Sequence, residues 1–177
     1  MCGEEHLYTQ TAMNNLALTY RGHGRWNEAE ELGVRVLKTR KPVLGDEHPG
    51  TLNSMGSLTL IYDMLGRWNE AEELGVRVME TMKRVLGEEH PDTLASMGNL
   101  ASTYRSLSRW NEAEELGARV MKTMKRVLGE EHSGTLTSMG NLAATYQDLR
   151  RWNEAEVLGV RVLETRKRVL GRSTSIR

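Results

Sequence analysis

The sequence predicts an all-α fold, built as a solenoid of four tandem helix–turn–helix repeats with eight helices. The chain matches itself at a shift of 42 residues, and a period of this size is typical of solenoid proteins. Within each repeat, apolar residues recur at gaps of three and four, which is the spacing of one helix face. No stretch alternates between apolar and polar residues, so we predict no strands.

The repeats are marked by residues that return at the same spacing. Each repeat contains the motif R-W-N-E-A-E, with glycine, histidine and tyrosine at fixed distances from it, and its tryptophans are Trp26, Trp68, Trp110 and Trp152. The 177 residues therefore divide into units of about 3–44, 45–86, 87–128 and 129–170, followed by a short tail at 171–177. No linker interrupts the pattern, so we predict a single repeat domain over residues 1–177.

The first helix of a unit is clearest in the third unit, where it follows Pro91. Apolar residues recur at helical spacing from Leu94 to Leu107. Proline suits the first position of a helix, and Asp92 places a negative charge on the positive end of the helix dipole. The pattern predicts a helix that begins at Pro91.

The second helix of the same unit begins near Trp110 and carries a longer apolar stripe. Gly129 follows the stripe, at the place where a residue in the left-handed conformation is expected to cap the end of the helix. The connection between the two helices is short and centres on Ser108, which predicts an antiparallel hairpin. The first two units have glycine at this position, at Gly24 and Gly66.

One pair of helices cannot bury its apolar face alone, so neighbouring pairs must stack. Interior glycines such as Gly98 and Gly117 each destabilise a helix by roughly 1 kcal/mol relative to alanine. Their recurrence indicates either a close approach of packed helices, at about 8–10 Å between axes, or simple inheritance by duplication. Both interpretations stay open at this point.

The motifs resemble those of a known family. From Thr93 to His132 the sequence is similar to the 42-residue tetratricopeptide repeats of kinesin light chains and fungal NOD-like receptors, and the similarity extends over essentially the whole chain. The resemblance implies a right-handed superhelix. It also implies small packing residues at Ala101 and Ala113, aromatic ones at Tyr104 and Trp110, and a role as a scaffold for protein–protein interaction.

By the same resemblance, the first helices line a concave groove that receives a partner protein or peptide. The units differ from one another mainly on these helices, where recurring side-chain amides are suited to hydrogen-bond an extended peptide backbone. The alternative interpretation is drift on an exposed face after duplication. The predicted groove residues are Asn15, Arg21, Asn53, Asp63, Asn99, Arg105, Asn141 and Gln147.

The two ends of the array differ from its middle. Gln10 stands where the other units have leucine, which favours a polar cap at the N-terminal end. At the other end Val157 replaces a glutamate that the first three units share, and we expect the residues after Gly171 to be too few for a capping helix. The alternative function is therefore a structural repeat protein that stacks end to end as a homo-oligomer. Its predicted self-association face is Val157, Leu158 and Val162.

Composition and spacing argue against several other functions. Lys+Arg and Asp+Glu both number 24, so the net charge is zero and we predict neither a nucleic-acid nor a membrane partner. One histidine per unit cannot converge on an ion, so we predict no metal site and no other cofactor. The carboxylates of R-W-N-E-A-E are expected on a solvated face, and the tryptophans in the core. We therefore predict no enzymatic activity.

Cys2 is the only cysteine, so the chain cannot form an internal disulfide. A single thiol suits a reducing compartment, and no apolar run is long enough to span a membrane. The expected location is cytoplasmic.

Overall fold

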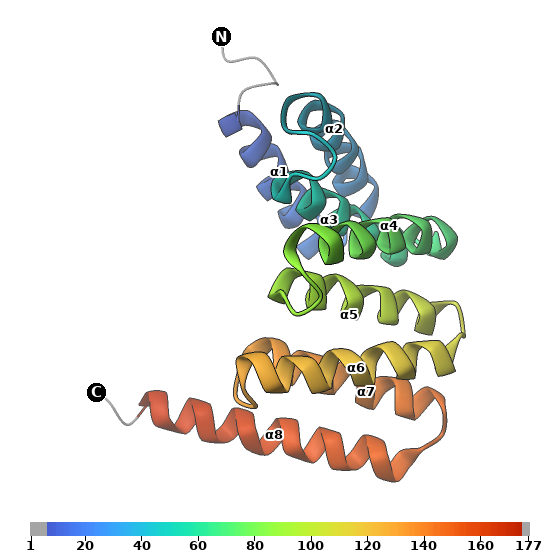
Figure 1. Ribbon diagram of the computed structural model, residues 1–177, viewed down its shortest axis with the longest axis vertical. Coiled ribbons are helices and arrows are strands. Elements are labelled where there is room, and N and C mark those ends of the chain that lie inside the picture. Colours follow the sequence, from blue (N-terminus) through green and yellow to red (C-terminus); the bar gives the residue numbers. More distant parts are fainter. Residues whose placement is uncertain (1–6, 175–177) are drawn as a thin grey trace. The chain divides into compact units, whose positions relative to one another are not determined.

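The computed structural model describes residues 7–174, which form eight helices and no strand (Figure 1). This confirms the predicted fold class and the 42-residue repeat. The helices are α1 (Leu7–Gly22), α2 (Trp26–Leu44), α3 (Pro49–Met64), α4 (Trp68–Leu86), α5 (Pro91–Ser106), α6 (Trp110–Leu128), α7 (Ser133–Asp148) and α8 (Trp152–Thr174).

The chain divides into two compact units, Met1–Glu88 and Glu89–Arg177, and each contains two helix pairs. In the first unit α1 pairs with α2 and α3 with α4, while α2 also packs against α3. The second unit repeats this order, because α5 pairs with α6, α7 with α8, and α6 packs against α7. The single domain and the right-handed superhelix concern the whole array and remain predictions.

The turn inside each helix pair contains one residue with positive φ. Gly24 and Gly66 have φ of 72° in the first unit, whereas Ser108 and Arg150 have φ of 60° and 59° in the second. The backbone conformation is thus kept although the residue type changes. A residue with a Cβ atom is strained in this region by about 1–2 kcal/mol.

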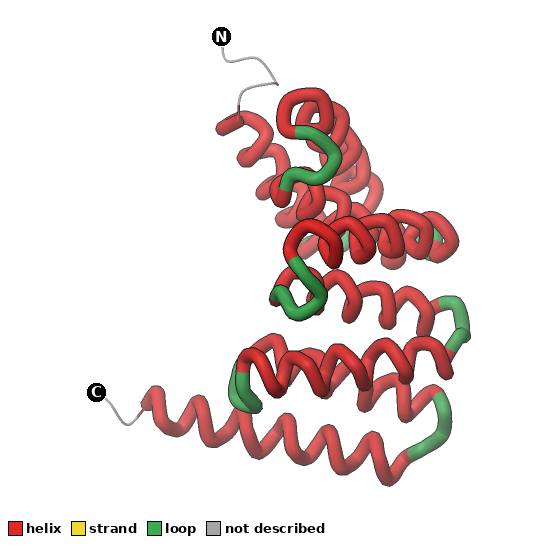
Figure 2. The backbone as a smooth tube through the Cα atoms, in the orientation of Figure 1, coloured by secondary structure: helices red, strands yellow, loops and turns green. Residues whose placement is uncertain are grey.

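Each loop between pairs begins with a glycine and ends with a histidine; the loops are drawn in green in Figure 2. Gly45, Gly87 and Gly129 end the second helices with φ of 87–93° and ψ of 159–165°, a region that is essentially confined to glycine. The left-handed cap predicted at Gly129 is therefore wrong, because its ψ of 165° is extended. The following histidine then caps the next first helix. For example, His90 Nδ1 accepts a hydrogen bond from the backbone N–H of Asp92 at 3.2 Å.

Helix α8 differs from the other second helices because it continues through Gly171 to Thr174. The predicted tail at 171–177 is therefore helical as far as Thr174, and residues 175–177 lie outside the described residues. The other glycines precede a loop whose histidine starts a new helix, whereas Gly171 precedes Arg172-Ser173-Thr174. Without that loop sequence, the last helix continues.

Within each unit, the core lies between the two helices of a pair and between the two pairs. Alanine of R-W-N-E-A-E is fully buried in the first three repeats, which fits the small packing residues predicted at Ala101 and Ala113. The prediction that the tryptophans are core residues is wrong for three of them, since Trp68, Trp110 and Trp152 are 43%, 40% and 59% exposed. Each is the first residue of its helix and therefore lies at an edge of the stack.

Gln10 does not contribute to the polar cap predicted at the N-terminal end. Gln10 is only 1% exposed, so its side chain points into the first unit and not to the outside. Exposed residues of α1 include Ala12, Leu16 and Thr19 instead. These residues are spaced by four and three, so they share one helix face, and that face is not strongly polar.

Candidate functional site

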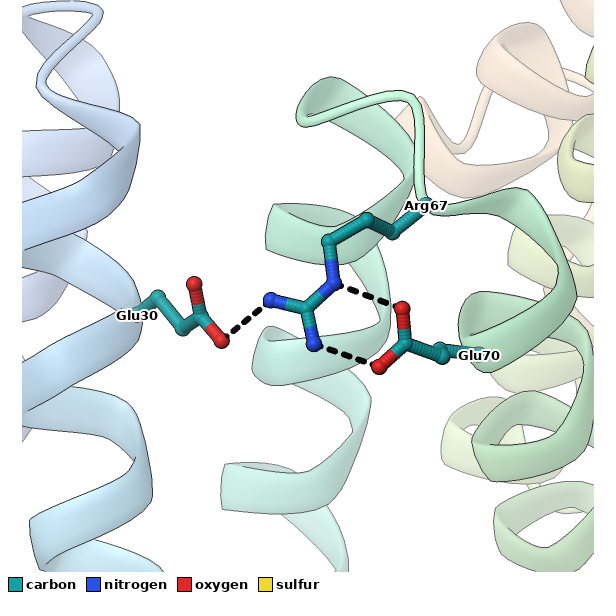
Figure 3. A network of polar contacts seen from close by, with 3 residues as sticks. All are labelled: Glu30, Arg67 and Glu70. Carbon is teal, nitrogen blue, oxygen red and sulfur yellow. Dashed lines mark hydrogen bonds and ion pairs between the residues drawn. The ribbon is translucent and has the colours of Figure 1, made fainter.

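The arginine of the R-W-N-E-A-E motif joins neighbouring repeats. Figure 3 shows Arg67, which precedes α4, between Glu30 of α2 and Glu70 of α4. Arg67 Nη1 donates to Glu30 Oε1 at 2.5 Å, and Arg67 Nε donates to Glu70 Oε2 at 2.6 Å. The guanidinium also stacks over the ring of Tyr62, 4.4 Å from its centroid. The hydrogen bonds from Arg67 lower the pKa of Glu70 below its ordinary value.

The second unit repeats this cluster around Arg151. Its guanidinium donates to Glu114 of α6 and to Glu154 of α8, both at 2.6 Å, and lies 4.5 Å from the Tyr146 centroid. These carboxylates are exposed or half-buried, as predicted, but they are paired with arginine. Paired in this way, they connect helices and are poorly suited to acid–base catalysis. The sequence carried the signal, because arginine always precedes the tryptophan, but spacing alone does not show its cross-repeat partner.

Acidic residues of the loops make a second set of ion pairs, each with the second helix of the same repeat. Glu47 Oε1 accepts from Arg84 Nη2 at 2.6 Å, and the hydrogen bonds from Arg84 lower the pKa of Glu47. Glu89 pairs with Arg126 in the same way, and Glu131 pairs with Arg168. This second set of ion pairs therefore fixes each loop to the second helix of its own repeat.

The predicted groove residues lie on first helices, and none of the eight is fully buried. Two of them meet in the second unit, where Arg105 of α5 and Asn141 of α7 line one narrow cleft between α5, α6 and α7. The cleft has a volume of about 20 Å³, which is room for about one water molecule. Arg105 Nε is held there by Asp148 Oδ2 at 2.6 Å.

The other groove residues are not brought into that cleft. Gln147 lines a separate hollow of about 520 Å³ at the turn end of the second unit, together with Trp110 and Trp152. Asn99 is half-exposed on α5. The remaining four lie in the first unit, where Asn15 and Asn53 are exposed, and Arg21 and Asp63 are half-buried.

A groove also runs between the two second helices of each unit. In the first unit it has a volume of about 420 Å³ and a charged wall that includes Glu73 and Arg77. In the second unit it has a volume of about 310 Å³, and Val157 stands in the position of Glu73 beside Met121 and Leu142. This substitution makes the second groove more apolar than the first.

The three residues of the predicted self-association face do not have equal exposure. Val157 is 65% exposed, whereas Leu158 and Val162 are half-buried. The next residues along the helix are more open, with Val160 47% exposed and Leu163 54% exposed. Helix α8 therefore has an exposed apolar surface that extends beyond the predicted residues.

Among residues 7–174, no three histidine, cysteine, aspartate or glutamate side chains come close enough to hold a metal ion. In the same part of the chain, no helix combines the length and the apolar character that crossing a membrane requires. Cys2 and His6 lie outside the described residues.

Comparison with known proteins adds a family. The family model of the tetratricopeptide repeat, compared with the sequence, matches residues 8–83, 64–125 and 99–168. A Podosopora anserina protein described as a kinesin light chain with nearly identical tetratricopeptide-like repeats is 31% identical, over 96% of this chain and 80% of that one. Two crystal structures of it, one of a single-residue variant, give TM-scores of 0.77 and 0.73.

More distant structures show the fold alone. BtubC from P. vanneervenii is 22% identical over 92% of this chain and 65% of its own, with a TM-score of 0.76. The apo form of RapI is 13% identical over 94% of this chain and 58% of its own, with a TM-score of 0.74. No curated protein sequence matches the chain.

Proposed function

Because the chain belongs to the tetratricopeptide repeat family, we propose that it is a non-enzymatic scaffold that binds a protein or peptide along its first helices. The fold is typical of protein-interaction scaffolds. The proposal rests above all on Asn99 and Asn141 of the second unit. Within residues 7–174 their side-chain amides make no hydrogen bond, and Asn141 lies at the cleft beside Arg105.

An amide side chain both donates and accepts hydrogen bonds, so it matches the alternating N–H and C=O groups of an extended peptide. The arginine beside it adds charge, and its ion pair with Asp148 fixes its position in advance. Preorganised groups lose little entropy when a ligand binds. We therefore propose that an extended segment with at least one acidic side chain lies across α5 and α7.

The test is affinity for peptides selected from a random displayed library against the whole chain. Replacement of Asn99 and Asn141 by alanine should weaken a selected peptide at least about tenfold, as expected for two lost hydrogen bonds. Asn111 and Asn153 are exposed asparagines on the second helices. Their replacement by alanine is the matched control and should leave the affinity unchanged. Equal affinity of all three proteins would remove the support for the groove.

The second candidate function is a structural repeat protein that associates with itself through its fourth repeat. It is favoured by the exposed apolar residues of α8, among which Val157 is 65% exposed and Leu170 is 66% exposed. Exposed apolar patches of this kind commonly mark interaction sites. Sedimentation velocity over a wide concentration range tests it. A mass that stays monomeric at the highest concentration would count against self-association.

We also propose that the partner is a protein and not a nucleic acid or a membrane, since the formal net charge is zero. The single cysteine suits a reducing compartment, and on this ground we place the function in the cytoplasm.

A further inference from the structure

Helix α2 presents a set of residues to α3 that we call the junction face: Gly33, Leu37, Arg40 and Leu44. A Cβ atom on Gly33 would lie 3.5 Å from Leu58 Cδ1, so that leucine of α3 packs directly over the glycine. Arg40 Nη1 donates to the carbonyl oxygen of Gly50 at 3.0 Å and to Ser54 Oγ at 2.6 Å. Leu37 packs against the buried cluster of the first unit.

Helix α8 carries the same four residue types at the same four positions, at Gly159, Leu163, Arg166 and Leu170. Helices α4 and α6 have methionine at the second and third of these positions, so α8 matches α2 and not its nearer neighbours. On α8 this face is open. Leu163 is 54% exposed, Arg166 is exposed, and nothing lies within 4 Å of a Cβ atom placed on Gly159.

Helix α1 has the complementary surface. Leu58 of α3 and Leu142 of α7 lie over Gly33 and Gly117 of the preceding second helix, and they are 3% and 2% exposed. Leu16 is the equivalent residue of α1, and it is 42% exposed. The molecule therefore has an uncovered leucine on α1 and an uncovered glycine on α8.

The first and last repeats also carry charges of opposite sign at positions that form an ion pair between the repeats inside each unit. In both units the motif arginine of one repeat donates to a glutamate of the preceding repeat, as Arg67 does to Glu30. Arg25 is the equivalent arginine of the first repeat, and within the described residues it pairs only with Glu28. Glu156 is the equivalent glutamate of the last repeat, and it has no ion-pair partner in residues 7–174.

We propose that α1 of a second copy of the chain docks on the junction face of α8, with Leu16 over Gly159 and Arg25 paired with Glu156. The proposal rests on the second function above and names the partner surface for it. Because the two surfaces differ, the contact is heterologous and leaves one free surface at each end of the dimer. Further copies then add to the same ends.

Two variants each remove one surface and leave the other intact. Leu16→Glu places a charge in the centre of the α1 surface. Gly159→Leu fills the space above α8, and it also favours the helix, because leucine has a higher helix propensity than glycine. Val43→Glu is the matched control, since Val43 is an exposed apolar residue of α2 outside both surfaces. Circular dichroism confirms that each variant is folded.

Sedimentation velocity measures the association. We expect the unmodified chain and Val43→Glu to form species of increasing mass with concentration, and each of the two variants alone to stay monomeric. A mixture of Leu16→Glu with Gly159→Leu should form a one-to-one dimer, because each partner contributes its one intact surface. The affinity of each variant alone should be at least about tenfold weaker than that of the mixture.

Three results would overturn the inference, and they differ in what they leave standing. Self-association of Leu16→Glu as strong as that of the unmodified chain would exclude α1, but self-association through α8 would remain. A mixture that stays monomeric would exclude the pairing of α1 with α8. An unmodified chain that stays monomeric at all concentrations would remove both this inference and the second function, without affecting the peptide groove.

Discussion

Helices α2 and α8 carry the same four junction residues, yet α3 covers those of α2, whereas α7 is the only helix within residues 7–174 that contacts α8. The same arginine type is 8% exposed at Arg40, whereas Arg166 is an exposed residue. Burial in a repeat protein is therefore set by the neighbour and not by the repeat itself. On α8 the same four residue types are left uncovered, and the docking proposed above would cover them.

The largest expected effect compares a covered leucine with an uncovered one. Leu142→Ala removes a buried side chain and should lower the free energy of unfolding by about 2–5 kcal/mol. Leu16→Ala, at the equivalent position of α1, should lower it by less than about 1 kcal/mol. Urea unfolding at a concentration that keeps the chain monomeric measures both. An equal decrease in the free energy of unfolding for both variants would show that Leu16 is as well packed as Leu142.

A second prediction concerns the buried arginine. Burial lowers the pKa of Arg40, and its buried Nε has no hydrogen-bond partner. Arg40→Met should raise the free energy of unfolding by about 1–3 kcal/mol, because a buried charge is replaced by the residue type of α4 and α6. Arg166→Met on the open face of α8 should give no such gain. A loss of stability with Arg40→Met would mean that its bonds to Gly50 and Ser54 outweigh desolvation.

The turns give a smaller effect that sharpens the comparison between the two units. Ser108→Gly and Arg150→Gly should each raise the free energy of unfolding by about 0.5–1 kcal/mol, because glycine adopts positive φ without strain. Gly66→Ser should lower it by a similar amount. Thermal unfolding of the three variants measures this. No difference between glycine and serine would mean that the turns are not strained.

Low pH distinguishes the contribution of the ion pairs to stability from that of the buried apolar faces, because only the ion pairs depend on ionised carboxylates. Hydrogen bonds from arginine lower the pKa of Glu70 and Glu154 below the ordinary value of 4.5. A carboxylate with a lowered folded-state pKa stabilises the fold above its unfolded-state pKa, and this contribution is lost as pH falls through the folded-state pKa. We expect the unfolding temperature to fall by a few degrees below about pH 4.5, and less in high salt. The double variant Glu70→Gln, Glu154→Gln should show a smaller fall.

The sequence was sufficient for the helices and for their order. The 42-residue period, the helix start at Pro91 and the glycine of positive φ in the turns of the first two repeats all correspond to features of the structure, because they act through local backbone geometry. Local backbone geometry does not show which residues are buried by a neighbouring helix. The sequence predicts the tryptophans in the core, although three of them are exposed at the starts of their helices.

The candidate surfaces were predicted only in part. Val157 is open as expected, but the neighbouring Leu158 and Val162 are half-buried, and the open face extends to Leu163. Helical periodicity gives the residues that share a face, but the direction of that face depends on packing with α7. Similarly, nothing in the spacing of Gln10 shows that its side chain is buried.

The most direct test of the inferred contact is a covalent cross-link between two copies of the chain that each carry one cysteine substitution. Leu16→Cys and Gly159→Cys are each made in a chain in which Cys2 is replaced by serine, and they are treated with a short bis-maleimide. We predict covalent dimers in the mixture at a yield far above that of either protein alone. Equal yields in the mixture and in the separate proteins would contradict docking of α1 on α8.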